Sequence, residues 1–221
     1  FIRPNGTQEL PAPKRGGTIN QLKDYINIQT PEDFTLIVSW LLAALRPSGP
    51  FPILSVNGEQ GSAKSTACQL LRELVDPNAA NLRTSPRDER DLVISASNSW
   101  VLGYDNLSYI KPQLSDALCR ISTGGGFSTR KLYTDAEETI FSAMRPIIFN
   151  GIGEIVNRSD LLDRAISIGL SAIPEDRRCT EEQLCAEFRQ AQPYILGALL
   201  DAVATGLRNL PDTKLDSLPR V

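Results

Sequence analysis

The chain of 221 residues contains no histidine. Imidazole is the proton acceptor of the Ser-His-Asp and Cys-His hydrolases, and it is a ligand in the histidine-containing motifs of zinc hydrolases. All of these mechanisms are therefore excluded. No other feature of the composition removes as many candidate enzyme classes.

The sequence also lacks long apolar segments. No run approaches the roughly 20 residues that span a bilayer, and the N-terminus has no apolar signal-peptide core. Hydrophobic residues make up 41% of the chain and charged residues 22%, as in ordinary globular proteins. We therefore expect a cytoplasmic protein that has no membrane partner.

The cysteines and the net charge point to no metal centre and no general affinity for nucleic acid. Cys68, Cys119, Cys179 and Cys185 lack the paired spacing of metal ligands, so we predict free structural thiols. A net charge of −3 argues against non-specific coating of nucleic acid. A local basic element could still contact phosphate.

The chain begins with Phe1, and Met144 is its single methionine, so we expect a fragment whose partners include other domains of a longer polypeptide. Residues 1–30 are predicted to be an irregular entry segment. Thr30 and Pro31 then suit the start of a helix. Strands alternate with helices over 31–175, and 176–221 reads as a C-terminal helical region broken near Pro193. This order predicts a three-layer α/β sandwich with a parallel central sheet.

A glycine-containing loop follows the first predicted strand. The run 51-FPILSV-56 is apolar, and 65-STACQLLRELV-75 has helical spacing. Between them, 57-NGEQGSAKST-66 matches the phosphate-binding pattern Gly-x-x-x-x-Gly-Lys-Ser/Thr, with alanine in place of the second glycine. The pattern predicts a nucleotide site made of Gly58, Glu59, Gln60, Gly61, Ser62, Ala63, Lys64, Ser65 and Thr66.

Successive backbone N–H groups at such a helix start can hold a polyphosphate. In this prediction Lys64 reaches the terminal phosphates, and the Ser65 hydroxyl binds Mg²⁺. Ala63 is expected where the backbone already turns into the right-handed helix, because an L-residue is unstrained there. Gly58 and Gly61 would supply the conformations that a side chain forbids.

An acidic residue ends a second predicted strand. Asp105 closes 99-SWVLGYD-105, which is where ATPases place the carboxylate that supports Mg²⁺. The residue after it is Asn106. Its amide can orient water but cannot accept a proton from it.

In this order, the motifs resemble those of the AAA+ P-loop ATPases, nearest to the superfamily 3 and poxvirus or phage primase-helicase-like proteins of viruses, phages and mobile elements. The loop 58-GEQGSAKS-65 is also similar to that of minichromosome maintenance helicases and MoxR-type ATPases. The resemblance covers roughly residues 50–170. It implies binding of ATP and Mg²⁺, and a ring of identical subunits, a hexamer, with single- or double-stranded DNA in its pore.

Three further segments carry the resemblance. The stretch 122-STGGGFSTRKLY-133 is similar to a pore-facing loop or hairpin, so Arg130 and Lys131 are expected to bind DNA phosphates, with a solvated basic turn as the alternative. The strand 146-PIIFN-150 resembles the family's third motif, which implies that Asn150 holds the attacking water.

The segment 161-LLDRAISI-168 resembles the one that supplies an arginine finger to the neighbouring subunit, which implies this role for Arg164. Arg158 is the alternative finger. A sensor arginine stays open among Arg177, Arg178 and Arg189.

The expected function is an Mg²⁺-dependent ATPase module of a ring-forming DNA helicase or primase-helicase. Its catalytic residues would be Lys64, Asp105, Asn106, Asn150 and Arg164, and its metal ligands Ser65 and Asp105. Two alternatives stay open. One is an AAA+ protein-remodelling or regulatory switch, in which Asn106 slows hydrolysis. The other is a scaffold that binds nucleotide without turnover.

Overall fold

The centre of the fold is a parallel four-stranded sheet. The computed structural model describes residues 4, 6–130, 138–153 and 155–214. The strand order is β2-β5-β1-β6, with parallel pairing throughout. The strands are β1 (Ile53–Gly58), β2 (Leu102–Leu107), β5 (Ile147–Gly151) and β6 (Ala165–Leu170). Because β1 lies inside the sheet, the loop that follows it starts between the ends of β5 and β6.

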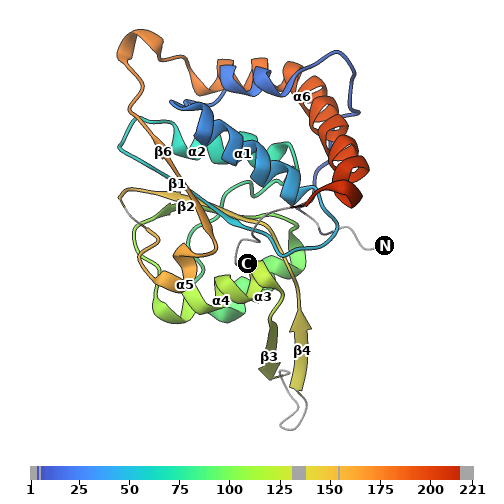
Figure 1. The fold of residues 1–221 in the computed structure, drawn as a ribbon. Coiled ribbons are helices and arrows are strands. Elements are labelled where there is room, and N and C mark those ends of the chain that lie inside the picture. The colour runs from blue at the N-terminus through green and yellow to red at the C-terminus, as the bar shows by residue number, and fades with distance from the viewer. Residues whose placement is uncertain (1–3, 5, 131–137, 154, 215–221) are drawn as a thin grey trace.

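Helices cover both faces of this sheet (Figure 1). Each face has its own apolar core, one containing Trp40 and Phe188 and the other Leu92 and Leu118. The predicted three-layer α/β sandwich is therefore confirmed. On one face lie α1 (Pro31–Ala44), α2 (Lys64–Glu73) and α6 (Glu181–Asn209), and on the other α3 (Glu89–Asn98), α4 (Pro112–Thr123) and α5 (Ser159–Leu162).

The start of α1 follows from local sequence. The Thr30 hydroxyl accepts a hydrogen bond from the backbone N–H of Asp33 at 3.1 Å, and Pro31 occupies the first helical position. Before it, the expectation of an irregular segment is wrong in one part, because residues Ile19–Asp24 form a 3₁₀ helix, η1. Leu22 in η1 is fully buried and joins the same apolar core as α6.

The predicted break in the C-terminal helix is also wrong. One helix, α6, runs through Pro193 and changes direction along its length (Figure 1). The backbone N–H of Lys14 donates to the Pro193 carbonyl at 2.8 Å, so the N-terminal segment crosses α6 there. No helix in the described part of the chain combines the length and apolar character of a membrane span.

A hairpin projects from the sandwich (Figure 1). It consists of β3 (Gly126–Arg130) and β4 (Glu138–Ser142), which pair antiparallel. The hairpin predicted after α4 is thus confirmed as far as Arg130, whereas Lys131 lies outside the described residues. Two short 3₁₀ turns, η2 (Glu175–Arg177) and η3 (Leu210–Asp212), flank α6.

Candidate functional site

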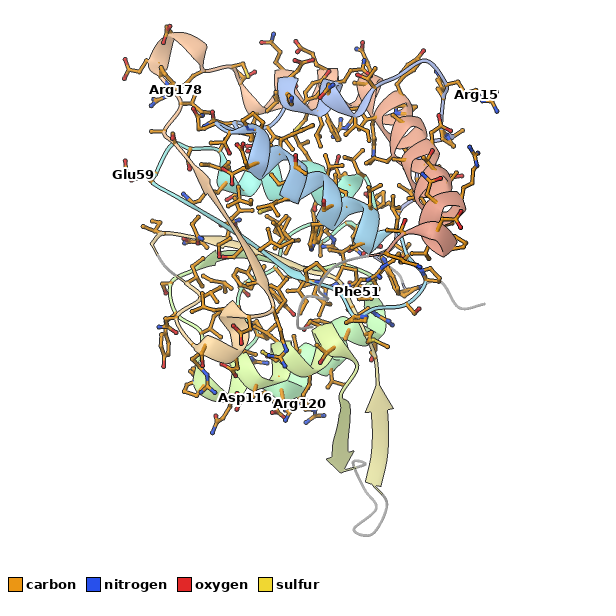
Figure 2. All side chains as sticks on the ribbon, viewed as in Figure 1. Arg15, Phe51, Glu59, Asp116, Arg120 and Arg178 are labelled. Carbon is orange, nitrogen blue, oxygen red and sulfur yellow. The ribbon has the colours of Figure 1, made fainter. Side chains whose placement is uncertain are left out.

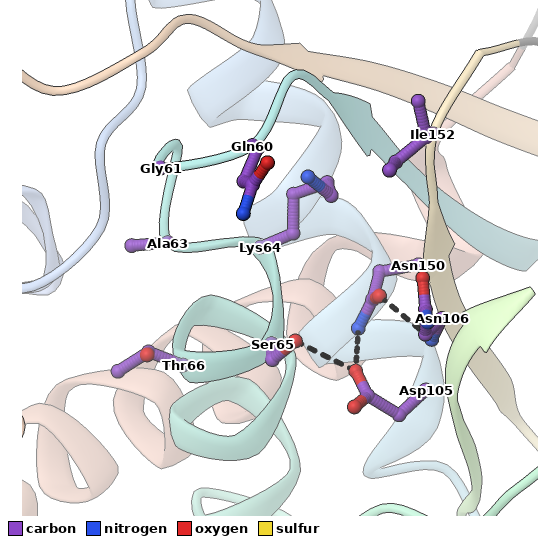
Figure 3. Close-up of a pocket in the computed structure, with 10 residues that line it drawn as sticks. All are labelled: Gln60, Gly61, Ala63, Lys64, Ser65, Thr66, Asp105, Asn106, Asn150 and Ile152. Atoms are coloured by element: carbon purple, nitrogen blue, oxygen red, sulfur yellow. Dashed lines mark hydrogen bonds between the residues drawn. The ribbon is translucent and has the colours of Figure 1, made fainter.

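A polar pocket lies at the carboxyl ends of β1, β2 and β5. Its volume is about 590 Å³. Parallel strands bring their carboxyl ends to one edge of a sheet, which is why segments far apart in the sequence meet here. Figure 3 shows the residues that line it, namely Gln60, Gly61, Ala63, Lys64, Ser65, Thr66, Asp105, Asn106, Asn150 and Ile152.

The carboxylate of Asp105 is the centre of a hydrogen-bond network (Figure 3). Its Oδ1 accepts from Ser65 Oγ at 2.7 Å and from Asn150 Nδ2 at 2.7 Å. Asn150 is buried, and its Oδ1 accepts from the backbone N–H of Asn106 at 3.0 Å. The Asn150 amide is therefore fixed at both ends and holds the carboxylate against the Ser65 hydroxyl.

The ammonium group of Lys64 lies over its own loop, residues 58–65, which we call the glycine loop. Lys64 Nζ donates to the Glu59 carbonyl at 2.7 Å and to Ser62 Oγ at 3.4 Å. Ser62 is buried and donates to the same carbonyl at 2.8 Å. These acceptors carry no net charge. A phosphate oxygen would compete with them for the ammonium, because its negative charge adds Coulomb attraction.

The backbone of the glycine loop corrects one prediction. Ala63 is the N-cap of α2 and has φ 58° and ψ 34°, so it is left-handed rather than part of the right-handed helix. For a residue other than glycine this conformation costs about 1–2 kcal/mol. Gly61 is also left-handed, with φ 81°. A Cβ on Gly58 would lie 2.3 Å from the Leu170 carbonyl, so the approach of the loop to β6 requires glycine there.

Asn106 has a conformational role that the sequence did not reveal. Its φ is 53°, a left-handed value that asparagine tolerates better than most residues. The pairing of β2 with β5 shifts register between Tyr104 and Leu107, next to this residue. The irregular backbone turns the N–H of Asn106 toward Asn150.

Cys68, on α2, lies beside Asn150 of β5. It is fully buried, and burial raises the pKa of its thiol to about 12, so it is protonated at neutral pH and is no nucleophile. In the described ranges, no group of three or more His, Cys, Asp or Glu side chains could hold a metal ion. A cation at Ser65 and Asp105 would therefore need oxygen atoms from a ligand or from water.

Two of the predicted residues do not line this pocket. Arg164 immediately precedes β6, at the end opposite the glycine loop, and a strand of 6 residues is about 20 Å long. Its Nη1 donates to the Asp160 carbonyl at 2.6 Å. Arg158 forms ion pairs with Asp116 at 2.9 Å and with Asp160 at 3.2 Å. Neither arginine lines the pocket of its own chain.

Of the three candidate sensor arginines, Arg178 lies at the glycine loop. A Cβ on Gly61 would be 3.7 Å from Arg178 Nη2, and Arg178 Nε donates to the Ile173 carbonyl at 3.1 Å. The backbone N–H of Ile173 in turn donates to the Gly61 carbonyl at 3.1 Å. Arg189 instead lies near Glu73. Burial raises the pKa of the Glu73 carboxyl, and the positive charge of Arg189 partly opposes this rise. The side chain of Arg177 lies outside the described part.

The architecture defines an α/β domain with the fold of helicase domains. The apo C-terminal region of NrS-1 is 15% identical, with a TM-score of 0.62, and the match covers 90% of this chain and 48% of that chain. The JCV helicase is 12% identical, with a TM-score of 0.50, and the match covers 89% and 61% of the two chains. At these identities the likeness concerns the fold alone, and the chain spans about half the length of the NrS-1 structure.

The chain belongs to the family of actinomycete integrative conjugative element replication proteins, because the sequence profile of this family matches residues 19–214. No curated protein sequence matches the chain significantly. The prediction of a replication protein with a helicase-type fold is confirmed at this level. The roles of the individual pocket residues stay predictions.

Proposed function

We propose that the chain is the Mg²⁺-dependent, ATP-binding and ATP-hydrolysing module of a ring-forming DNA helicase or primase-helicase. The observation that carries the proposal is the 2.7 Å hydrogen bond between Ser65 Oγ and Asp105 Oδ1. It joins the hydroxyl of the residue after Lys64 to the carboxylate of Asp105, which lies near the carboxyl end of β2. The replication family and the helicase fold of the neighbours support the same class.

In this proposal, the backbone N–H groups of the glycine loop and the start of α2 bind the phosphates of ATP. Lys64 Nζ leaves the Glu59 carbonyl and moves onto the terminal phosphates, where its charge offsets theirs. Arg178 lies next to Gly61 and adds a second positive charge at the same loop.

The oxygen atoms of Ser65 and Asp105 fit a magnesium ion, which prefers one or two protein oxygens together with phosphates and waters. Both atoms already meet at one point of the pocket. When bound, Mg²⁺ would supply positive charge to the β- and γ-phosphates. Asn150 holds Asp105 in place for this task, and in this proposal its amide also orients the attacking water.

The other proposed partners are DNA and further copies of the chain. Arg130 lies at the end of β3, in the hairpin that projects from the sandwich, and with Lys131 it would contact DNA phosphates. We call the polar pocket, in which ATP is proposed to bind, the nucleotide pocket. Arg164 would enter the nucleotide pocket of a neighbouring copy, because the length of β6 separates it from its own pocket.

The test of this proposal is ATP hydrolysis measured in the presence of Mg²⁺. Lys64→Ala removes the phosphate-binding charge and Asp105→Ala removes a metal ligand, so each is expected to lower kcat on the order of 10²-fold. Lys111→Ala is the matched control, because this exposed lysine precedes α4 and does not line the pocket. Unchanged turnover in both pocket variants would overturn the proposal.

The observation that favours a second candidate, an AAA+ protein-remodelling or regulatory switch, is Asn106 beside Asp105. An amide cannot accept a proton, which predicts slow hydrolysis.

The effect of single-stranded DNA on turnover separates the two candidates. For a helicase module we expect DNA to raise kcat several-fold, and the double variant Arg130→Ala/Lys131→Ala to abolish this stimulation while basal turnover persists. Turnover indifferent to DNA in both proteins would favour the switch.

A further inference from the structure

An apolar pocket lies at the amino ends of β1 and β6, opposite the nucleotide pocket. Its volume is about 480 Å³. Leu36 on α1, 41% exposed, forms part of its open side, whereas Phe51 is buried. Arg164 also lines it, and Nε of this arginine is buried without a hydrogen-bond partner in the described structure. We call this cavity the amino-end pocket, and its apolar lining residues are Leu36, Pro50, Phe51, Pro52, Ala165 and Ile166.

One large apolar side chain, that of Ile152, lines the nucleotide pocket. Ile152 is 63% exposed and belongs to neither apolar core. It follows β5 between Gly151 and Gly153, and it lines the nucleotide pocket (Figure 3). A lone exposed isoleucine needs no explanation in general. Its location matters here, because it lines the pocket that a residue of another copy would enter in the proposed function.

The two features lie at opposite ends of the same strand. β1 connects Phe51, which precedes it, to Glu59 at the start of the glycine loop, and Figure 2 shows these two residues at its two ends. One copy can therefore present the amino-end pocket to one neighbour and Ile152 to another. Contacts of this head-to-tail kind close into rings or extend into filaments.

We propose that Ile152 of one copy inserts into the amino-end pocket of the next copy. This inference rests on the proposed function, in which Arg164 reaches a neighbour's nucleotide pocket. Arg164 lines the amino-end pocket, and Ile152 lines the nucleotide pocket. When the Arg164 guanidinium of one copy enters the nucleotide pocket of the next, the apolar residues of the amino-end pocket contact Ile152 of that next copy. Entry also removes Arg164 Nε from a site where it lacks an acceptor.

The test uses complementary variants of the 221-residue chain, measured by sedimentation with Mg²⁺ and a non-hydrolysable ATP analogue. Ile152→Asp destroys the inserted side chain, and Leu36→Asp places a charge in the pocket. Each variant alone is expected to sediment as a single chain of 24.2 kDa, whereas the parent assembles. An equimolar mixture retains one intact contact, between the Ile152 of one variant and the pocket of the other. It should therefore give a species of twice the chain mass and nothing larger.

The control is Ile94→Asp, which changes an isoleucine on α3 that is 52% exposed and lines neither pocket. It should assemble like the parent. The inference is overturned if the parent sediments as a single chain, if either variant still assembles, or if the mixture forms no dimer. Calorimetric titration of Leu36→Asp with the analogue tests the nucleotide site separately. If Leu36→Asp binds the analogue but the mixture forms no dimer, only the proposed contact is refuted. If Leu36→Asp does not bind the analogue, the proposed function is refuted.

Discussion

Replacing Arg164 with alanine is expected to lower kcat for ATP hydrolysis by about 10³-fold, the lower end of the range for arginine fingers. The guanidinium would stabilise charge that develops on the transferred phosphate. It lies at the end of β6 opposite the glycine loop, so in the proposed function it acts on the pocket of another copy. Turnover per chain should therefore rise with protein concentration in the parent and stay low in the variant.

A mixing experiment shows whether this arginine acts between chains. Lys64→Ala keeps Arg164 but has a defective nucleotide pocket, and Arg164→Ala has the opposite defect. Combined, the two variants should recover part of the parental rate, because some pockets then face an intact arginine. Failure to recover activity in the mixture would place the arginine's effect within its own chain.

Arg158 provides the comparison within the same segment. Its guanidinium is already paired with two carboxylates of its own chain, those of Asp116 and Asp160, which leaves it less free to enter a neighbouring pocket. Arg158→Ala should therefore reduce kcat far less than Arg164→Ala. The reverse order of effects would identify Arg158 as the finger.

The parts of the fold that the sequence predicted are those set by local signals. Thr30 and Pro31 define a helix start through one hydroxyl and one fixed dihedral angle, and the structure places α1 there. The apolar run before the glycine loop and the helical spacing after it likewise gave β1 and α2. Each of these signals lies within a few residues of the element that it predicts.

The pocket was predictable for a different reason. Ser65, Asp105 and Asn150 each lie close to the carboxyl end of a strand, and a parallel sheet brings such ends to one edge. Their placement in one pocket therefore follows from strand direction. The sequence did not reveal that Asn150 donates to Asp105 and accepts from the Asn106 backbone, because this depends on the strand order and on the irregular end of β2.

The incorrect predictions concern residues whose conformation depends on distant contacts. Ala63 was expected where the backbone turns into the right-handed helix, because an L-residue is unstrained there, yet its backbone is left-handed. Leu22 and Ile26 stand among polar residues, and their burial in the same core as α6 is a contact between segments far apart in the sequence. Pro193 is a reliable helix breaker in isolation. Here the packing of α6 on the sandwich and on the N-terminal segment keeps the helix continuous.

The largest stability effect is expected at Arg72, a fully buried arginine on α2. Its Nη1 donates to the carbonyls of Ala80 and Asn81, and its Nη2 pairs with Asp76 at 3.2 Å. Asp76 in turn accepts from the backbone N–H groups of Trp100 at 3.1 Å and Val101 at 2.9 Å. The network ties the helix after the glycine loop to the segment that leads into β2 and Asp105.

Arg72→Leu should lower the free energy of unfolding by about 3–5 kcal/mol, because it leaves the Asp76 carboxylate buried without its cation. Urea-induced unfolding followed by circular dichroism measures this loss. The total stability of a domain is about 5–15 kcal/mol, so the variant should be marginally folded. The surface pair of Arg87 and Asp91 is the matched control, since Arg87 is 86% exposed and Arg87→Ala should lower the free energy of unfolding far less than Arg72→Leu does.

A second substitution separates the destabilisation caused by the unpaired Asp76 charge from that caused by lost packing. Arg72→Leu/Asp76→Asn removes both charges, and the asparagine oxygen can still accept from the N–H groups of Trp100 and Val101. The double variant should therefore be more stable than Arg72→Leu alone, although the Ala80 and Asn81 carbonyls still lack their donor. If the double variant is no more stable than the single one, the loss arises from those carbonyls and from packing. If Arg72→Leu costs no more than Arg87→Ala, the buried network does not stabilise the fold.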